Sequence, residues 1–184
     1  MLSSPAPDIR SQLPALGEKI RVVTWPYGVK GLYALRNFAI LDEKNEYLVK
    51  ANSYWFLLNT ETGRPMRIME SDTAPYGEFS PKLEMEDAGR KIQVPKEMGE
   101  TGRMVVMKHL LDTNLHVNNA QYVDIARELL PAGTEISEIR AEYRKAAVLG
   151  DEIVIRSARE GKSYLVSLCN PDGDVFANIE LKEM

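Results

Sequence analysis

The feature that most constrains the fold is a polar turn followed at once by an amphipathic segment, between Leu110 and Pro131. After the turn, apolar residues recur at spacings of three and four, which predicts a helix with one buried face. These residues are Tyr122, Ile125, Ala126, Leu129 and Leu130. Asn118 or Asn119 is a suitable N-cap, and Pro131 supplies the stop, so we expect a helix over residues 118–130.

The turn ahead of this helix concentrates polar side chains within eight positions. Its members are Asp112, Asn114, His116, Asn118 and Asn119. Because the turn leads directly into the helix, the imidazole lies near the positive end of the helix dipole. Such a cluster is suited to proton transfer, but by itself it is also typical of a capped turn without a catalytic role. Both interpretations stay open on the spacing alone.

The rest of the chain is dominated by segments that read as antiparallel strands, separated by short turns such as Asn170–Gly173. We expect strands at residues 20–24, 32–41, 47–58, 103–109, 138–148, 152–158, 164–169 and 175–181. Residues 59–102 lack periodicity and are rich in charge, proline and glycine, which predicts a linker with a possible strand at 90–94. The predicted organisation is therefore strands over 1–58, a linker over 59–102 and a strand–helix–sheet unit over 103–184.

Composition excludes several classes of protein. A net charge of −4 and the lack of a basic, aromatic-interleaved segment argue against nucleic-acid binding. No apolar segment approaches the roughly 20 residues that cross a bilayer, and the N-terminus does not resemble a secretory signal. Cys169 is the only cysteine, and we expect a small core residue rather than a nucleophile. Asp112 and His116 lack an evident third metal ligand. We therefore expect a cytoplasmic protein without a metal or cofactor.

A short internal repeat bears on the architecture. Leu16–Ile20 (LGEKI) is echoed by Leu149–Ile153 (LGDEI), and each copy begins a strand, a second strand, a charged turn and a closing strand. The second copy is preceded by a strand, a helix and another strand, whereas the first is preceded by only fifteen residues. If the similarity is not accidental, the first copy lacks its helix.

Several motifs in order give the chain a family resemblance. Asp112–Tyr122 (DTNLHVNNAQY) resembles the active-site turn of acyl-acyl-carrier-protein thioesterases, which are double-hotdog enzymes. The first hotdog of bacterial members is similar to four segments here: Thr24–Pro26, Arg36–Phe38, Ala51–Trp55 and Thr62–Pro65. Glu142–Lys145, followed by Gly150–Asp151, resembles the strand beside the active site. The resemblance runs from about Leu13 to the C-terminus.

The resemblance implies an α+β tandem (double) hotdog, in which a long antiparallel sheet wraps around a central helix. The N-terminal hotdog is expected to be incomplete, because nothing here corresponds to the family's first strand and first helix. A second departure lies in the strand beside the site. Plant-type members have a catalytic glutamate three residues after the tyrosine of the Glu-Tyr-basic-basic motif, where this chain has Ala146. Glu142 lies about 13 Å away along an extended strand and cannot replace it.

The resemblance also assigns roles to the turn. Asp112, Asn114 and His116 are the expected catalytic residues for thioester hydrolysis. His116 would polarise a water as general base, since imidazole side chains titrate near neutral pH. Asp112 would orient Asn114, and Asn114 would hold the water or the oxyanion. Backbone N–H groups at the start of the helix are further oxyanion donors. His109 is expected at the end of a strand or on the surface.

The function implied is release of fatty acids from acyl-carrier protein in fatty-acid biosynthesis, with the acyl chain between sheet and helix. The expected partner is therefore an acylated carrier protein, with no nucleic acid and no membrane. An acyl-CoA thioesterase is the first alternative, and a degenerate hotdog that binds acyl chains or oligomerises without turnover is the second. Because a missing first helix would leave an apolar sheet face uncovered, we also expect a homo-oligomer.

Overall fold

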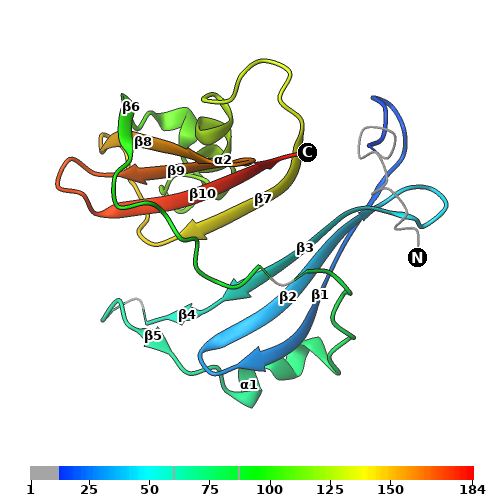
Figure 1. The fold of residues 1–184 in the computed structure, drawn as a ribbon. Helices are drawn as coiled ribbons and strands as arrows, with labels where there is room; N and C mark the ends of the chain where they lie inside the picture. Colours follow the sequence, from blue (N-terminus) through cyan, green and yellow to red (C-terminus); the bar gives the residue numbers. More distant parts are fainter. Residues whose placement is uncertain (1–12, 60, 87) are drawn as a thin grey trace. The chain divides into compact units, whose positions relative to one another are not determined.

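The computed structural model describes residues 13–59, 61–86 and 88–184, which divide into two compact units between Ala88 and Gly89 (Figure 1). The division falls inside the segment 59–102 that the sequence predicts as a linker. The first twelve residues of the predicted 1–58 segment lie outside the described residues. Unit 1 contains β1 (Arg21–Lys30), β2 (Tyr33–Leu41), β3 (Tyr47–Trp55), β4 (Leu57–Leu58), β5 (Pro65–Met66), α1 (Glu70–Thr73) and η2 (Ala74–Tyr76). Unit 2 contains β6 (Gly99–Val105), η3 (Lys108–Leu110), α2 (Asn119–Arg127), β7 (Ile136–Tyr143), β8 (Glu152–Glu160), β9 (Ser163–Cys169) and β10 (Val175–Glu183).

Unit 1 is built on an antiparallel sheet in the order β1–β2–β3. One face of this sheet is covered by the segment that follows η2. There the side chain of Asn37, which is fully buried, donates to the carbonyl of Ala51 and accepts the N–H of Leu83. Lys50 Nζ, on the same face by register, reaches the carbonyl of Glu84. A buried amide with partners on both sides fixes the position of the covering segment.

The other face of the same sheet has little cover. Val22, Ile40 and Val49 are aligned across the three strands, and Val22 and Val49 are 67% and 39% exposed. Trp55, on this face by its register with Ala34, is 52% exposed. Over the described part of unit 1, the helical segments are the four residues of α1 and the three of η2. No long helix packs on this face among those residues, in keeping with the expected incomplete hotdog.

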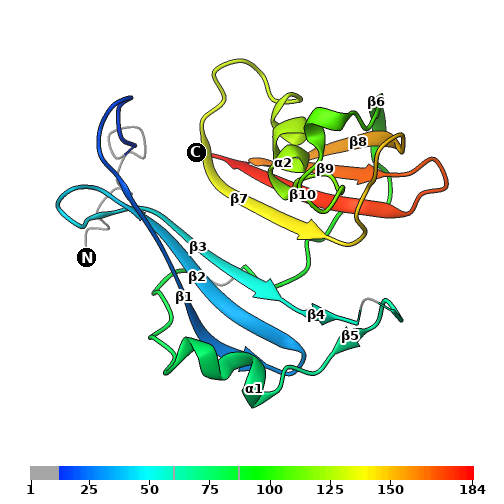
Figure 2. The ribbon, with the colours of Figure 1, turned by 180° about the vertical axis from the view of Figure 1, so that it is seen from behind.

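Unit 2 is a five-stranded antiparallel sheet in the order β6–β8–β9–β10–β7, with α2 against one face (Figures 1 and 2). Alternation along each strand separates the two faces. The helix-facing side chains form the main core together with Tyr122 and Ala126 of α2. Those from the sheet are Ile153, Val166, Leu168, Phe176, Ala177, Ile179 and Leu181, none more than 2% exposed. This confirms the predicted α+β architecture with a helix on a long antiparallel sheet.

The helix begins as predicted but ends early. Asn118 is the N-cap, and its side-chain oxygen accepts the N–H of Ala120. We expected the helix to reach residue 130, but α2 ends at Arg127. The N–H groups of Leu129 and Leu130 bond three residues back, to Ala126 and Arg127, which tightens the last turn before Pro131.

Several predicted strand boundaries are also wrong. The strand expected to end at residue 24 continues to Lys30 as β1, and the strand expected at 47–58 is interrupted at Phe56, between β3 and β4. The strand expected at residues 103–109 is β6, which starts at Gly99 and ends at Val105, and His109 lies in η3 instead. Residues 90–94 form no strand. Their backbone bonds to side chains, because the N–H of Ile92 donates to Glu142. The strand expected to reach residue 148 ends at Tyr143, after which two N–H groups converge on the carbonyl of Phe176.

Candidate active site

The polar turn is organised around the carboxylate of Asp112. Its Oδ1 accepts the backbone N–H groups of Asn114 at 2.8 Å and His116 at 3.2 Å, and its Oδ2 lies 3.5 Å from Asn114 Nδ2. The Asp112 N–H donates to the His116 carbonyl at 2.8 Å, which closes the loop. Leu115 completes the turn with a positive φ of 62°. This geometry presents the Asn114 and His116 side chains outward.

Hydrogen bonding keeps the Asp112 carboxylate charged. Desolvation acts to raise the pKa of Asp112, but the N–H groups of His116 and Asn114 and the Asn114 side chain outweigh it, so the pKa lies below its usual value. The structure therefore brings Asp112 to Asn114, as the sequence predicts. It does not bring the Asp112 carboxylate into a hydrogen bond with the imidazole, because Asp112 contacts His116 through the backbone.

His116 lies on the surface next to the chain that follows β7. An isolated antiparallel bridge pairs His116 with Val148, and the N–H of Val117 donates to the carbonyl of Ala147 at 2.9 Å. The His116 side chain is exposed, and its imidazole has no hydrogen bond within the part of the chain that the structure describes. Ala146, which is also exposed, belongs to the segment whose backbone pairs with His116 and Val117.

Two tyrosines connect α2 to this segment. Tyr122, buried in the core, accepts the N–H of Ala147 at 3.0 Å with its hydroxyl oxygen. Tyr143 donates its hydroxyl to the carbonyl of Asn119 at 3.0 Å, and the two rings pack 6.0 Å apart. Burial raises the pKa of both phenols, which therefore stay protonated at neutral pH. The sequence predicts Tyr122 only as a core residue. Its link to Ala147 spans 25 positions, and no local pattern signals it.

The start of α2 offers one free backbone donor. The N–H of Ala120 is taken by the Asn118 side chain, and that of Gln121 donates to the Asn118 carbonyl. Within the described residues, the N–H of Asn119 has no hydrogen-bond partner. It lies at the positive end of the helix dipole, three residues after His116, which makes it the available anion donor of this turn.

The space between α2 and the sheet is occupied by packed side chains, so the expected acyl site between them is not open. Tyr122, Ala126, Phe176 and Ile179 there are at most 2% exposed. Apolar side chains are instead exposed around the turn. They form an apolar collar of Met107, Leu115, Val148 and Leu149, whose exposed fractions lie between 42% and 70%. The bridge between His116 and Val148 and the bond from Gly150 to Val106 hold these segments together.

The remaining candidates are not part of the turn. Glu142 faces the opposite side of the sheet and accepts the N–H of Ile92 at 3.2 Å, so it does not replace the carboxylate that Ala146 lacks. His109 is exposed in η3, in agreement with a surface position. Cys169 is a buried free thiol, as expected of a core cysteine.

No group of three His, Cys, Asp or Glu side chains among the residues with described positions is arranged to hold a metal ion. No helix over those residues has the length and apolar character needed to span a membrane.

Sequence comparison decides the family. Residues 8–76 match the acyl-ACP thioesterase N-terminal domain, and residues 95–180 match the acyl-ACP thioesterase C-terminal domain. Together these matches cover most of the chain. The chain belongs to the acyl-ACP thioesterase family. The expected family is therefore confirmed, and each unit of the structure contains one of the two domain matches.

Individual relatives agree with this assignment. The chain is 29% identical over 162 residues to a chloroplastic palmitoyl-acyl carrier protein thioesterase of Cuphea hookeriana, a match that covers 80% of this chain and 37% of the relative. It is 29% identical over 149 residues to a chloroplastic dodecanoyl-[acyl-carrier-protein] hydrolase of Cinnamomum camphora. This match covers 74% of this chain and 38% of the relative. The chain thus spans less than two fifths of the length of these curated relatives.

Solved structures give the same fold. A 12:0-ACP thioesterase from Umbellularia californica superposes with a TM-score of 0.80 at 22% identity, covering 93% of this chain and 70% of the other. An acyl-ACP thioesterase from Bacteroides thetaiotaomicron superposes with a TM-score of 0.78 at 21% identity, covering 91% and 69%. At these identities the likeness is evidence of the fold alone, and it supports the predicted hotdog architecture.

Proposed function

We propose that this acyl-ACP thioesterase family member hydrolyses the thioester of acyl-acyl-carrier protein and releases a free fatty acid for lipid metabolism. The observation that carries the proposal is the Asp112-centred turn, which holds Asn114 and leaves the His116 imidazole unpaired beside the N-terminus of α2. Family membership supports the same reaction, because the relatives above are named as acyl-carrier-protein hydrolases.

In this proposal, His116 takes a proton from the attacking water, and the tetrahedral intermediate then collapses with loss of the carrier thiol. Asn114 hydrogen-bonds the water, in the orientation that the Asp112 carboxylate gives to its amide. The free N–H of Asn119 donates to the oxyanion, where a fixed donor is worth most in the transition state. A tight Asp112 turn keeps these groups at fixed spacing without a metal or cofactor.

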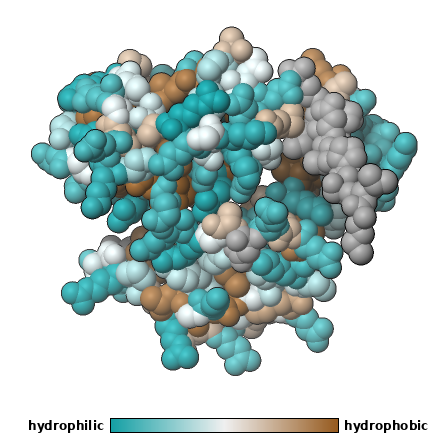
Figure 3. All heavy atoms as spheres, in the orientation of Figure 1, coloured by the Kyte–Doolittle hydropathy of each residue, from teal (hydrophilic) through white to brown (hydrophobic). Residues whose placement is uncertain are grey.

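The acyl chain is proposed to lie against the apolar collar of Met107, Leu115, Val148 and Leu149. Figure 3 shows that apolar side chains reach the surface of the molecule among hydrophilic ones. Leu115 is 70% exposed, although leucine side chains are usually buried, and a bound alkyl chain would remove that surface from water. Since this surface is open, occupancy by substrate would also shield the turn from bulk water.

Self-association is part of the proposal. The exposed row of Val22, Ile40 and Val49, together with Trp55, is proposed to pack on a second copy of the chain. Burying apolar surface of this kind is favourable at about 25 cal/mol per Å² before the costs of association. A cytoplasmic location stays a prediction; the single unpaired cysteine is consistent with a reducing compartment.

A non-catalytic acyl-binding or oligomerising protein is the second candidate, and one observation favours it. Ala146 lies two residues before Val148, the bridge partner of His116, at the position where plant-type members have a carboxylate, and Glu142 is engaged elsewhere. Without that carboxylate, His116 and the Asp112 turn must supply all of the proton chemistry.

The proposal is tested by hydrolysis assays of the purified chain on palmitoyl- and dodecanoyl-acyl-carrier protein, with the matching acyl-CoA thioesters in parallel. Faster release from the carrier-protein substrates is expected. Equal or faster release from acyl-CoA would favour the acyl-CoA alternative. Binding of both substrates without release would favour the non-catalytic one.

A further inference from the structure

A row of polar side chains crosses the face of the unit 2 sheet that points away from α2. Strand register aligns Glu100 of β6, Arg156 of β8, Ser167 of β9, Asn178 of β10 and Glu142 of β7. Two members of the row lie deep in the structure, because Ser167 is 7% and Asn178 is 3% exposed. Buried polar groups of this kind ordinarily have hydrogen-bond partners.

The segment between Gly89 and Met98 covers one end of this row. The N–H of Ile92 donates to Glu142, and Arg140 Nη2 donates to the Lys91 carbonyl at 3.1 Å. Arg140 is itself held by Glu180 at 2.6 Å. The segment is therefore tied down over β7 and β10. Further along it passes over β8 and β9 toward the start of β6 and leaves a hollow beneath it.

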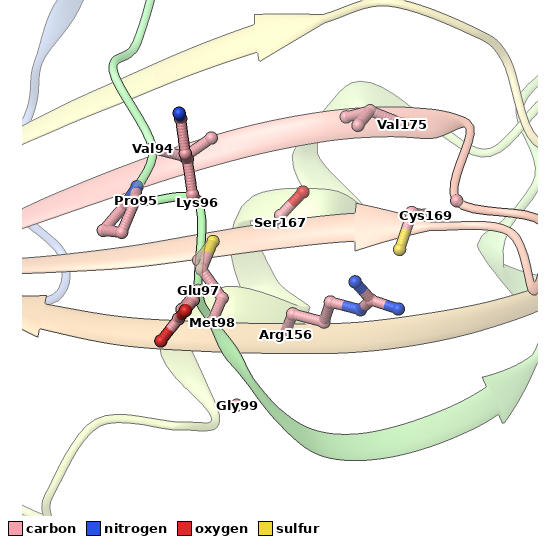
Figure 4. Close-up of a pocket in the computed structure, with 11 residues that line it drawn as sticks. Val94, Pro95, Lys96, Glu97, Met98, Gly99, Arg156, Ser167, Cys169 and Val175 are labelled. Carbon is pink, nitrogen blue, oxygen red and sulfur yellow. The ribbon is translucent and has the colours of Figure 1, made fainter.

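This hollow is a pocket of about 490 Å³, within the usual range for small-molecule sites. Arg156, Ser167 and Cys169 form its floor, and the segment Val94–Gly99 forms its wall (Figure 4). Val175, after the turn at Gly173, closes one end. Figure 4 shows the Arg156 side chain extended along the sheet, with its guanidinium toward Cys169.

Two polar groups of the floor, those of Arg156 and Ser167, have no hydrogen-bond partner among the described residues. Within the described chain, neither the Arg156 guanidinium nor the Ser167 hydroxyl makes a hydrogen bond or an ion pair, and the buried Oδ1 of the neighbouring Asn178 is also unpaired. Other arginines of this unit, such as Arg103 and Arg159, each hold a carboxylate. Glu100, across from Arg156, is engaged by Arg103 at 2.7 Å, and the charge of Arg156 acts on it without a hydrogen bond.

The charge of the lining also matters for the ligand. Lys96 and Arg156 contribute positive charge, and Glu97 contributes one carboxylate. The wall adds apolar surface from Val94, Pro95 and Val175. A guanidinium beside a hydroxyl matches the planar or tetrahedral oxygens of a carboxylate or phosphate, to which arginine donates two parallel hydrogen bonds.

We propose that this pocket binds a small oxyanion, a carboxylate or phosphate group on a compact body, through Arg156 and Ser167. The site lies on the opposite face of the sheet from α2, so it is separate from the proposed hydrolytic turn and does not depend on that activity. Its ligand bridges the guanidinium and the buried hydroxyl, and the apolar wall contacts the rest of the molecule.

The test is isothermal titration of the full chain with inorganic phosphate, with hexanoate and with hexanol as an uncharged control. At least one oxyanion is expected to bind, and hexanol at least about tenfold more weakly. Binding of phosphate alone, of hexanoate alone or of both would each support the site and would identify which kind of oxyanion it takes. Failure of both oxyanions at about 10 mM, or equal binding of hexanol, would overturn the proposal.

Variants locate the binding. Arg156→Gln should weaken it at least about tenfold, because a charge-assisted bidentate contact is lost, and Ser167→Ala should weaken it about threefold. Arg159→Gln is the matched control, on the same strand but the other face, and should change nothing. The changes in amide NMR chemical shift on adding the oxyanion should fall on residues 94–99. If Arg156→Gln leaves oxyanion binding unchanged, the anion binds elsewhere, for example at the His116 turn, and this assignment is refuted.

Discussion

Asp112 shows how one carboxylate fixes a polar turn without being fully buried itself. Its oxygens collect two backbone N–H groups and the Asn114 amide, so the loop has a single hydrogen-bonded form. The family resemblance predicts the pairing of Asp112 with Asn114, and short polar side chains in a turn commonly bond to nearby backbone. Their roles in hydrolysis stay a prediction.

The lowered pKa of Asp112 has a defined consequence for stability. A carboxyl group with a folded-state pKa below its unfolded value stabilises the fold above the unfolded pKa, and this contribution is lost as the pH falls through the folded one. Asp112→Asn should therefore lower the thermal midpoint at neutral pH, by an amount that is constant down to about pH 4 and shrinks below it. Differential scanning calorimetry of both proteins from pH 7 to 3 measures the difference, and a gap that closes near pH 6 would contradict this origin.

Tyr122 is predicted to matter more for stability than Tyr143. Removing the Tyr122 hydroxyl leaves the buried N–H of Ala147 without an acceptor, so Tyr122→Phe should lower the free energy of unfolding by about 1–3 kcal/mol. Tyr143→Phe is the matched control. It removes a donor from an exposed carbonyl that water can reach, and should cost less than about 1 kcal/mol. Urea unfolding monitored by circular dichroism gives both free energies. Equal losses would show that the bond to Ala147 stabilises the fold no more than the bond from Tyr143 does.

At the scale of elements, α2 starts where the sequence says it should. Asn118 caps the helix through Ala120, so Asn118→Ala should destabilise unit 2 by about 1 kcal/mol. Asn119→Ala changes the next residue, whose side chain caps nothing, and should be close to neutral. The measurement is again the free energy of unfolding in urea. If Asn119→Ala costs as much as Asn118→Ala, the assigned cap is wrong.

Element ends were harder to predict than element types. The helix stripe includes Leu129 and Leu130, but those residues turn back with short-range bonds ahead of Pro131. Gly99 and Gly102 read as breaks in the sequence, yet both lie in β6, where pairing with β8 outweighs their low strand propensity. The polar row from Glu100 to Glu142 depends on the register of five strands, and no single segment predicts it.

At the scale of the molecule, the uncovered face of the unit 1 sheet has the clearest consequence. The sequence predicts that this face is uncovered, because the first copy of the internal repeat has too few residues before it for a helix. Val22 and Trp55 are more than half exposed there. A monomeric soluble protein seldom leaves a contiguous apolar face in water.

We therefore expect a dimer or larger species in size-exclusion chromatography with light scattering. Val22→Lys should shift the protein toward the monomer, because a charge would be buried in the interface. Arg21→Ala, on the same strand but the other face, should leave the distribution unchanged. A strictly monomeric, folded wild-type protein would contradict self-association.

The central claim, that His116 performs thioester hydrolysis, is tested most directly by comparing the two histidines of the chain. Both side chains are exposed, and the two residues lie in neighbouring segments. Only His116 belongs to the Asp112 turn. His116→Ala should lower kcat/KM on acyl-acyl-carrier protein by about a hundredfold or more, which is the usual contribution of a general base. His109→Ala should retain wild-type turnover. Turnover that survives His116→Ala unchanged, in a chain that hydrolyses the substrate, would contradict the assignment.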